Sequence, residues 1–291
     1  MVRAVSGDVS VTILDGDGLD RSLVRMSNLE NSDSVLEGFT ITNGTSGSPH
    51  PSDPSRSVGG GLFVLDASPT VRNCVFRGNL ADDGGGAFLH GSATLLEDCV
   101  FDSNLALSSG GAIRMDLCSG VVRDCVLEGN ASGDWAGGVF VLGGSPTFEH
   151  TSFSINHAIS VGGAMVASLD SEPGGDVQLS GCSFQENSAD LDAGGVLVIG
   201  GLHDLRLVDC SMCDNLPNDL VGSWIDEGGN LFCDCIADLD GDGAVGGSDI
   251  SLLLGAWGPC APGCPEDANG DLKVDGADLA LMLSRWGLCD G

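Results

Sequence analysis

Short apolar and polar stretches recur along residues 1–232 with a period of about 25–34 residues. Most repeats hold a Gly-Gly pair followed by apolar residues; the pairs are Gly60-Gly61, Gly85-Gly86, Gly110-Gly111, Gly137-Gly138, Gly162-Gly163 and Gly194-Gly195. A second unit starts with Cys or Thr and ends in Asn five residues later, as in Cys74…Asn79, Cys99…Asn104, Cys125…Asn130, Thr151…Asn156, Cys182…Asn187 and Cys210…Asn215. A period of this size predicts one coil of a parallel β-helix per repeat.

Apolar residues at fixed places in these units predict the inner face of the coils. One column lies two residues after each Cys or Thr: Phe76, Phe101, Leu127, Phe153, Phe184 and Met212. Another follows the glycine pairs: Phe63, Phe88, Ile113, Phe140, Met165 and Leu197. Neighbours of this second column, such as Ala87, Leu89, Val139 and Val141, are then expected to face outward as an apolar strip.

Stacking the coils about 4.8 Å apart places equivalent residues above one another. The asparagines are therefore predicted to form an internal ladder of amide hydrogen bonds. We interpret the stacked cysteines as small buried hydrophobic residues, because parallel Cβ vectors at this spacing suit a relaxed disulfide poorly. These cysteines are Cys74, Cys99, Cys125, Cys182 and Cys210.

The run Gly-Phe-Thr-Ile-Thr-Asn-Gly at 38–44, together with the Gly-Gly and Cys-x-Phe-x-x-Asn units, resembles right-handed parallel β-helix proteins. This is the broad pectate-lyase-like and polymorphic-outer-membrane-protein superfamily, and the resemblance covers about residues 8–232. It implies a mainly β fold, a β-helix solenoid over 1–232. It does not select an activity, because the fold hosts lyases, hydrolases, adhesins and inert stalks.

The net charge of the chain limits the classes of binding partner that are expected. The chain has 42 acidic and 11 basic residues, a formal net charge of -31, which disfavours nucleic acid and anionic lipid and suits divalent cations. No apolar run reaches the roughly 18–20 residues needed to span a bilayer, so membrane insertion is not expected. The first residues lead directly into a predicted strand at 11–14. We therefore expect the β-helix to be truncated at its N-terminus, with an export signal upstream.

Residues 233–291 carry two loops with calcium-binding spacing, offset by 29 residues. Calcium takes hard oxygen ligands from loop positions 1, 3, 5, 7 and 12. The first loop offers Asp238, Asp240, Asp242, the Ala244 carbonyl and Asp249, and the second offers Asp267, Asn269, Asp271, the Lys273 carbonyl and Asp278. One amphipathic helix is predicted after each loop. Two Ca²⁺ sites are therefore expected.

Paired loops with only an exiting helix and with Asp at position 12 resemble a type I dockerin domain, a module that docks onto cohesin domains. The resemblance implies a cohesin-like partner. At positions 10 and 11, however, Gly247-Ser248 and Gly276-Ala277 replace the Ser-Thr pair of clostridial dockerins. Leu272 replaces the turning glycine of the second loop, and this predicts a weaker second site.

The cysteines of this region follow its internal symmetry: Cys235 and Cys264 precede the loops, and Cys260 and Cys289 follow the helices. Antiparallel packing of the two helices would favour the pairs Cys260–Cys264 and Cys235–Cys289. One disulfide inside each repeat is the alternative, and the sequence does not decide between them. A cysteine-rich chain of this kind is expected to be secreted, extracellular or at the cell surface.

One outer face of the predicted β-helix gathers charged residues, and its catalytic candidates are Arg72, Glu97, Asp98, Arg123 and Asp124. They are interpreted as an alternating charge ladder between coils. The alternative is a polysaccharide lyase site in which carboxylates hold calcium and an arginine removes a proton.

Three functions therefore stay open. The first is a calcium-binding protein whose β-helix interacts with polysaccharide or cell-surface glycan and whose C-terminal module mediates attachment or assembly. The second is a polysaccharide lyase or glycoside hydrolase acting on acidic polysaccharide. The third is a structural or adhesin stalk without catalysis. The sequence does not decide whether the chain is an enzyme.

Overall fold

A computed structural model describes residues 2–4, 9–10, 12–17, 21–45, 48–170, 174–232, 237, 239–240, 244–260, 264–268, 272–284 and 286–288. The chain divides into two compact units, Met1–Leu231 and Phe232–Gly291. No helix among the described residues is long and apolar enough to cross a membrane.

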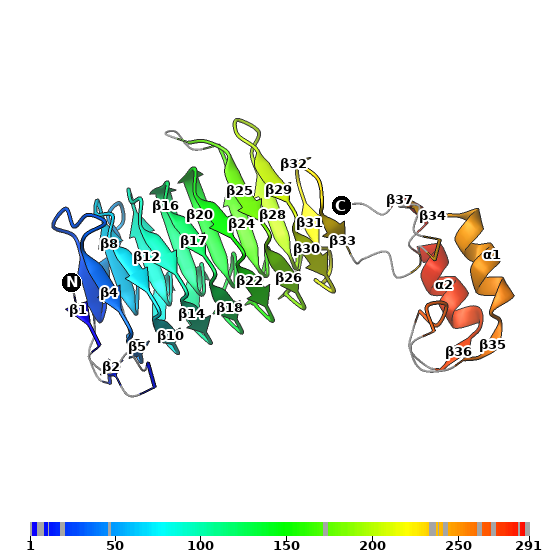
Figure 1. The fold of residues 1–291 in the computed structure, drawn as a ribbon, viewed down its shortest axis with the longest axis horizontal. Helices are drawn as coiled ribbons and strands as arrows, with labels where there is room; N and C mark the ends of the chain where they lie inside the picture. Colours follow the sequence, from blue (N-terminus) through cyan, green and yellow to red (C-terminus); the bar gives the residue numbers. More distant parts are fainter. Residues whose placement is uncertain are drawn as a thin grey trace. The chain divides into compact units, whose positions relative to one another are not determined.

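The first unit is a parallel β-helix, as predicted (Figure 1). A coil such as that of residues 70–90 contributes one strand to each of four sheets, and each strand pairs in parallel with the equivalent strand of the next coil. The described strands of sheet A are β1 (Val2–Arg3), β4 (Val35–Glu37), β9 (Thr70–Arg72), β13 (Leu95–Glu97), β17 (Val121–Arg123), β21 (Thr147–Glu149), β25 (Val177–Ser180), β29 (Leu205–Val208) and β32 (Trp224–Asp226). Those of sheet B are β2 (Ile13–Asp15), β5 (Thr40–Thr42), β10 (Val75–Arg77), β14 (Val100–Asp102), β18 (Val126–Glu128), β22 (Ser152–Ser154), β26 (Ser183–Gln185), β30 (Ser211–Cys213) and β33 (Leu231–Phe232).

Sheets C and D complete the coil. Sheet C contains β6 (Ser48–Pro49), β7 (Ser57–Val58), β11 (Leu80–Asp83), β15 (Leu105–Ser109), β19 (Ala131–Ser132), β23 (His157–Ala158) and β27 (Ser188–Ala189). Sheet D contains β3 (Val24–Met26), β8 (Leu62–Leu65), β12 (Ala87–His90), β16 (Ile113–Cys118), β20 (Val139–Gly144), β24 (Met165–Ser168), β28 (Val196–Ile199) and β31 (Leu220–Val221). Strands β6 and β7 form an antiparallel hairpin, here called the edge hairpin (residues 48–58).

The interior follows the predicted columns of sheet B. Phe76 and Phe101 pair in register, and their rings stack with centroids 4.7 Å apart; Phe153 and Phe184 stack at 4.5 Å. All four side chains are fully or almost fully buried. Burying successive aromatic rings in one column is the main hydrophobic contribution of this face to the coil stack.

The asparagine ladder is confirmed. Nδ2 of Asn104 donates to Oδ1 of Asn130 at 2.9 Å, and the same bond joins Asn130 to Asn156. Each amide also donates to a backbone carbonyl of an earlier coil, as Asn130 does to Phe101. The ladder ends where Asn215 donates to the carboxylate of Asp219. Buried amides are thus satisfied from coil to coil.

The five stacked cysteines are free and buried, which agrees with their prediction as small core residues, and Cys118 is a further buried thiol. Each thiol lies near a backbone carbonyl; for example, Sγ of Cys99 donates to the Glu97 carbonyl at 3.3 Å. Burial raises the pKa of Cys118 to about 12, so this thiol stays protonated at neutral pH.

One predicted column in sheet D was wrong. Phe88 pairs in register with Arg114, not with Ile113, and Arg114 pairs with Phe140. Ala87, Leu89, Val139 and Val141 were expected to face outward, but all four are buried. The glycine pairs Gly110-Gly111 and Gly162-Gly163 lie one residue earlier relative to the strands, which put Ile113 and Met165 into the wrong column. The four buried neighbours lie on the opposite face of the strands from Phe88 and Phe140. The Phe88 column therefore packs on the outer side of sheet D.

The second unit is built from two similar halves. Helix α1 (Gly247–Gly255) and helix α2 (Gly276–Ser284) follow the two predicted loops, and among the described residues no helix leads directly into either loop. Strand β34 (Ala244–Val245) pairs antiparallel with β37 (Gly287–Leu288), and β35 (Gly258–Pro259) pairs with β36 (Lys273–Val274). Each pairing joins the loop of one half to the segment that follows the helix of the other. The small core contains Ala237, Val245, Leu253, Val274 and Met282.

Candidate functional site

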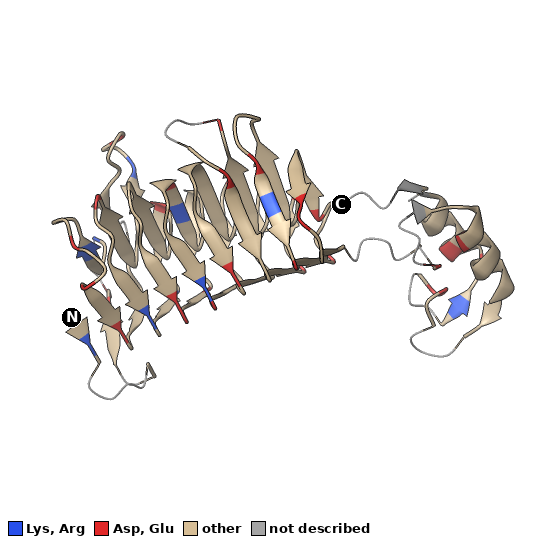
Figure 2. Ribbon diagram, turned by 45° about the horizontal axis from the view of Figure 1, so that its top comes forward, with Lys and Arg blue, Asp and Glu red and all other residues tan. Residues whose placement is uncertain are grey.

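The charged face that holds the catalytic candidates is an alternating ladder of charges on sheet A, in agreement with its interpretation from the sequence. Figure 2 shows basic and acidic strand ends following one another along this edge. Glu97 lies between Arg72 and Arg123 in the register of the sheet. Arg123 contacts Glu149 at 2.6 Å and Glu97 at 3.5 Å, and Arg72 contacts Glu37 at 3.1 Å. The structure therefore brings three of the five candidates into one ladder.

The other two candidates, Asp98 and Asp124, lie in the turns between sheets A and B. Their backbones adopt left-handed conformations, with φ of 52° and 51°, and both side chains are exposed. Asp residues tolerate this conformation better than most, because a short polar side chain can bond locally. Nδ1 of His150 lies 3.8 Å from the Asp124 carboxylate. These positions suit turn formation.

The chemistry of the ladder disfavours an arginine base. The hydrogen bond that Arg123 donates to Glu149, together with the negative charge of Glu149, raises the pKa of Arg123 above its usual value. A general base must release its proton near the working pH, so a raised pKa makes Arg123 less suited to that role. Exposed pairs of this kind contribute only about 0–1 kcal/mol each to stability.

A group of charged side chains that was not predicted from the sequence lies at the corner between sheets C and D. It consists of His50, Arg56, Asp83, Arg114 and Asp116, here called the corner cluster. Nη1 of Arg114 lies 2.8 Å from Asp83, and Nε lies 2.9 Å from Asp116. From the edge hairpin, Arg56 contacts Asp83 at 2.6 Å and Nε2 of His50 lies 3.4 Å from Asp116.

All members of this cluster except Arg56 are at most 8% exposed. Burial alone would raise the pKa of Asp116, but the close contact with His50 and the charge of Arg114 lower it below its usual value. Likewise, burial disfavours the charged Arg114, yet Asp116 and Asp83 raise its pKa. Both groups therefore stay ionised. The buried ion pairs join the edge hairpin to the coils and are not exposed for contact with a substrate.

A sequence signal for this cluster existed. Arg114 and Asp116 stand in a strand whose neighbours carry Phe88 and Phe140 at the position of Arg114. A charged residue in an otherwise apolar column calls for a buried partner. The partners His50 and Asp83 could not be found, because they come from the hairpin insertion and from another sheet.

The described part of the two calcium-type loops has matching geometry. The carboxylates of Asp249 and Asp278 are fully buried at the first turn of α1 and α2. Asp249 accepts a backbone bond from Gly246 at 2.6 Å, and Asp278 accepts the equivalent bond from Asp275 at 2.8 Å. Asp240, Ala244, Asp267 and Lys273 also lie in the described loops. Asp238, Asp242, Asn269 and Asp271 lie outside the described residues.

Asp249 is ionised in spite of its burial. Desolvation would raise its pKa, but backbone N–H groups of Gly246, Asp240 and Leu239 lower it below the usual value. The donor set of the two loops consists of carboxylate, amide and carbonyl oxygens, which are the ligands that calcium prefers. The residues present therefore fit a hard divalent cation.

Leu272 has the strained backbone that its loop position predicts, with φ of 69°, and its side chain is 48% exposed. Its N–H donates to Oδ2 of Asp267 at 2.8 Å. An L-residue held in the left-handed region costs about 1–2 kcal/mol relative to glycine.

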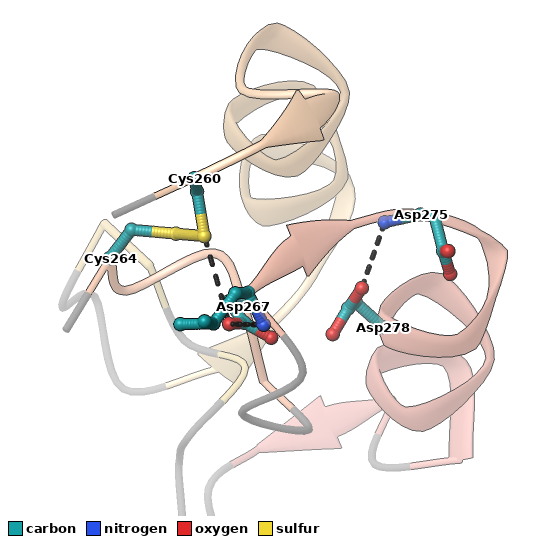
Figure 3. Close-up of a disulfide and its surroundings, with 6 residues drawn as sticks. Cys260, Cys264, Asp267, Asp275 and Asp278 are labelled. Atoms are coloured by element: carbon teal, nitrogen blue, oxygen red, sulfur yellow. Dashed lines mark hydrogen bonds between the residues drawn. A yellow bond between two sulfur atoms is a disulfide. The ribbon is translucent and has the colours of Figure 1, made fainter. Parts of the chain in front are cut away.

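A disulfide joins Cys260 to Cys264 near the second loop, with their Cα atoms 6.3 Å apart (Figure 3). Sγ of Cys260 lies 3.7 Å from Oδ2 of Asp267. Cys235 and Cys289 lie outside the described residues, so their pairing stays a prediction. Cys213 of β30 is also disulfide-bonded, which the sequence pattern did not predict.

Comparisons with known proteins agree with this architecture. The family model described as "Right handed beta helix region" matches residues 27–172, which is half of the chain. No curated protein matches the chain, and no solved structure does.

Proposed function

The chain belongs to the right-handed β-helix family, and from this premise we propose that its β-helix binds polysaccharide or cell-surface glycan without cleaving it. The observation that carries the proposal is the strict register of the coils. On the outer face of sheet A, charged side chains of alternating sign recur at the coil spacing of about 4.8 Å, so successive units of a polymer can meet regularly spaced contacts. A glycan chain is such a polymer.

Binding is favoured over cleavage by the ion pairs and the pKa of Arg123, the arginine that would be the base in the lyase alternative. Arg123 is paired with Glu97 and Glu149 and has a raised pKa. A lyase would need a base that loses its proton readily. The test is to incubate the protein with a polysaccharide panel while following binding, unsaturated products and new reducing ends. Products that disappear in Arg123→Ala would establish the lyase instead.

We further propose that the C-terminal unit binds two calcium ions. We also propose that it serves as an attachment module, as a type I dockerin domain does. The support is the buried, symmetric placement of Asp249 and Asp278, each at the end of a loop of oxygen donors. When bound, calcium would neutralise these carboxylates and hold each loop against its helix. Calorimetric titration with CaCl₂ should give two sites, and Asp249→Ala should remove the tighter one.

Attachment is supported by apolar side chains that the two helical halves expose at equivalent places. Leu254 and Trp257 of the first half correspond to Leu283 and Trp286 of the second, and all four are 50–55% exposed. Large exposed apolar residues at matching positions are typical of protein interaction surfaces. A cohesin-like protein is the proposed partner. Binding of a cohesin panel that Trp257→Ala plus Trp286→Ala abolishes would support it, and unchanged binding would refute this surface.

The place of action is proposed to be outside the cell. The support is chemical: Cys260–Cys264 is oxidised, and Cys213 is also disulfide-bonded. Disulfides persist in oxidising compartments and are rare in the cytosol. The remaining free thiols of the described residues are buried, which protects them from exchange.

A further inference from the structure

Most of the described arginines form ion pairs with carboxylates. Seven described arginines have a carboxylate oxygen within 2.6–3.4 Å: Arg3, Arg56, Arg72, Arg77, Arg114, Arg123 and Arg206. Arg21 and Arg25 are the exceptions among the described arginines, and both side chains are exposed. Two unpaired cations in a chain with a net charge of -31 are unexpected, because acidic partners are abundant.

Both arginines line the same cavity. It has a volume of about 510 Å³ and is lined by Arg21, Ser22, Leu23, Arg25 and Ser48. The two serines are at least nine-tenths buried, and their hydroxyl oxygens lie 3.1 Å apart. Two arginines and two serines therefore line one recess, whose size is in the range of small-ligand sites.

The position of the Arg25 guanidinium is fixed before any ligand arrives. Its Cζ lies 4.7 Å from the centroid of the Phe63 ring, which attracts a cation. Nε donates to Ser27 at 3.1 Å, and Nη1 donates to Ser48 at 3.3 Å. None of these contacts neutralises the positive charge. A guanidinium group that is already held in place loses less conformational entropy when it binds a planar or tetrahedral oxyanion.

A second cavity of about 440 Å³ adjoins the first and shares Leu23 and Arg25 with it. Its lining is mainly apolar, including Leu14 and Leu36, and its one described carboxylate, Glu30, accepts the Asn28 N–H at 2.7 Å. The combined surface presents cationic groups beside an apolar wall. This combination suits a ligand that carries an oxyanion on a ring with an apolar face.

We propose that Arg21 and Arg25 bind the oxyanion of an acidic sugar, either the carboxylate of a uronate or the sulfate of a sulfate ester. The inference rests on the proposed glycan-binding function and names the chemical class of the glycan. Guanidinium groups recognise carboxylate and sulfate through paired, charge-assisted hydrogen bonds. The acidic surface elsewhere repels such a ligand, so recognition must come from a local cationic site.

The test measures calorimetric binding of oligosaccharides of equal length to the full chain at about 0.15 M ionic strength, where exposed charges are screened beyond about 8 Å. The probes are a uronate oligomer, a sulfated oligomer, a neutral oligomer and inorganic sulfate. We expect at least one acidic oligomer to bind, and Arg21→Gln to weaken it about 10-fold or more. Arg25→Lys keeps the positive charge but removes the planar guanidinium with its paired N–H donors, and it should weaken binding as well.

Arg77→Gln is the matched control, because Arg77 is an exposed arginine that pairs with Asp102 on sheet B. It should bind like the unchanged protein, and thermal unfolding should show that all variants fold. Binding of the sulfated oligomer alone would identify a sulfate ester, and binding of the uronate alone would identify a carboxylate.

Acidic binding that Arg21→Gln leaves unchanged would overturn this site, and so would a preference for the neutral oligomer. In both cases the proposed glycan function would stand. If no oligosaccharide binds, both the site and the proposed function fail.

Discussion

Asp83 and Arg114 come from different sheets of the β-helix, yet Oδ1 of Asp83 accepts a 2.8 Å bond from Nη1 of Arg114 while both side chains are nearly buried. Removing Arg114 takes away the most buried cation of the corner cluster and leaves the Asp83 carboxylate with the partly exposed Arg56. Arg114→Met is therefore expected to lower the free energy of unfolding of the β-helix by about 3–5 kcal/mol. Denaturant unfolding followed by circular dichroism measures this.

The matched control for that substitution is Arg77→Met, which breaks the exposed pair with Asp102. Its cost should be at most about 1 kcal/mol. Equal effects of the two substitutions would contradict the role given to the corner cluster.

Acid stability should depend on Asp116. The pKa of this carboxyl is lowered in the folded protein, so it contributes stability above its unfolded pKa of about 3.9. That contribution is lost as the pH falls through the lower folded pKa. The free energy of unfolding should consequently fall less steeply below pH 4 in Asp116→Asn than in the unchanged protein. Urea unfolding between pH 2 and pH 6 checks this, and parallel pH curves would refute it.

Substitution of an asparagine in the middle of the ladder should strongly destabilise the β-helix. Asn130 accepts bonds from Asn104 and donates to Asn156 and to the Phe101 carbonyl. Asn130→Ala leaves several buried groups unsatisfied, each costing about 1–3 kcal/mol. We expect a loss of several kcal/mol or failure to fold, measured by thermal unfolding. Asn218→Ala, at an exposed asparagine bonded to Asp192, should be nearly neutral; similar losses would contradict the ladder's importance.

Leu272→Gly should tighten the second calcium site, because glycine adopts the φ of 69° without strain. The relief of about 1–2 kcal/mol corresponds to roughly 5- to 30-fold in affinity. Titration is best made in an Asp249→Ala background, which isolates this site. Leu272→Ala is the control, since it removes the side chain but keeps the strain. Unchanged affinity in Leu272→Gly would refute the prediction.

The repeats made most of the β-helix predictable. Phe76, Phe101 and the asparagines recur at constant spacing relative to the cysteines, so their columns could be read without a structure. The strand after the glycines was misaligned because the distance from the glycine pair to the strand varies by one residue at Gly110-Gly111. Because side chains alternate between the two faces of a strand, a misalignment by one residue assigns every side chain to the wrong face.

The sites were less predictable than the fold. The ladder of Arg72, Glu97 and Arg123 follows from the repeat itself. The contacts of His50 and the shared cavity of Arg21 and Arg25 depend on where an insertion folds back, and no periodic signal encodes that.

The central claim is that the β-helix binds glycan and does not cleave it. Incubation of the full chain with a broad polysaccharide panel in the presence of calcium tests this most directly, with retention on each polysaccharide and release of products followed together. The account predicts retention on at least one polysaccharide, without unsaturated products or new reducing ends. Product formation, or the absence of retention on every polysaccharide, would contradict it.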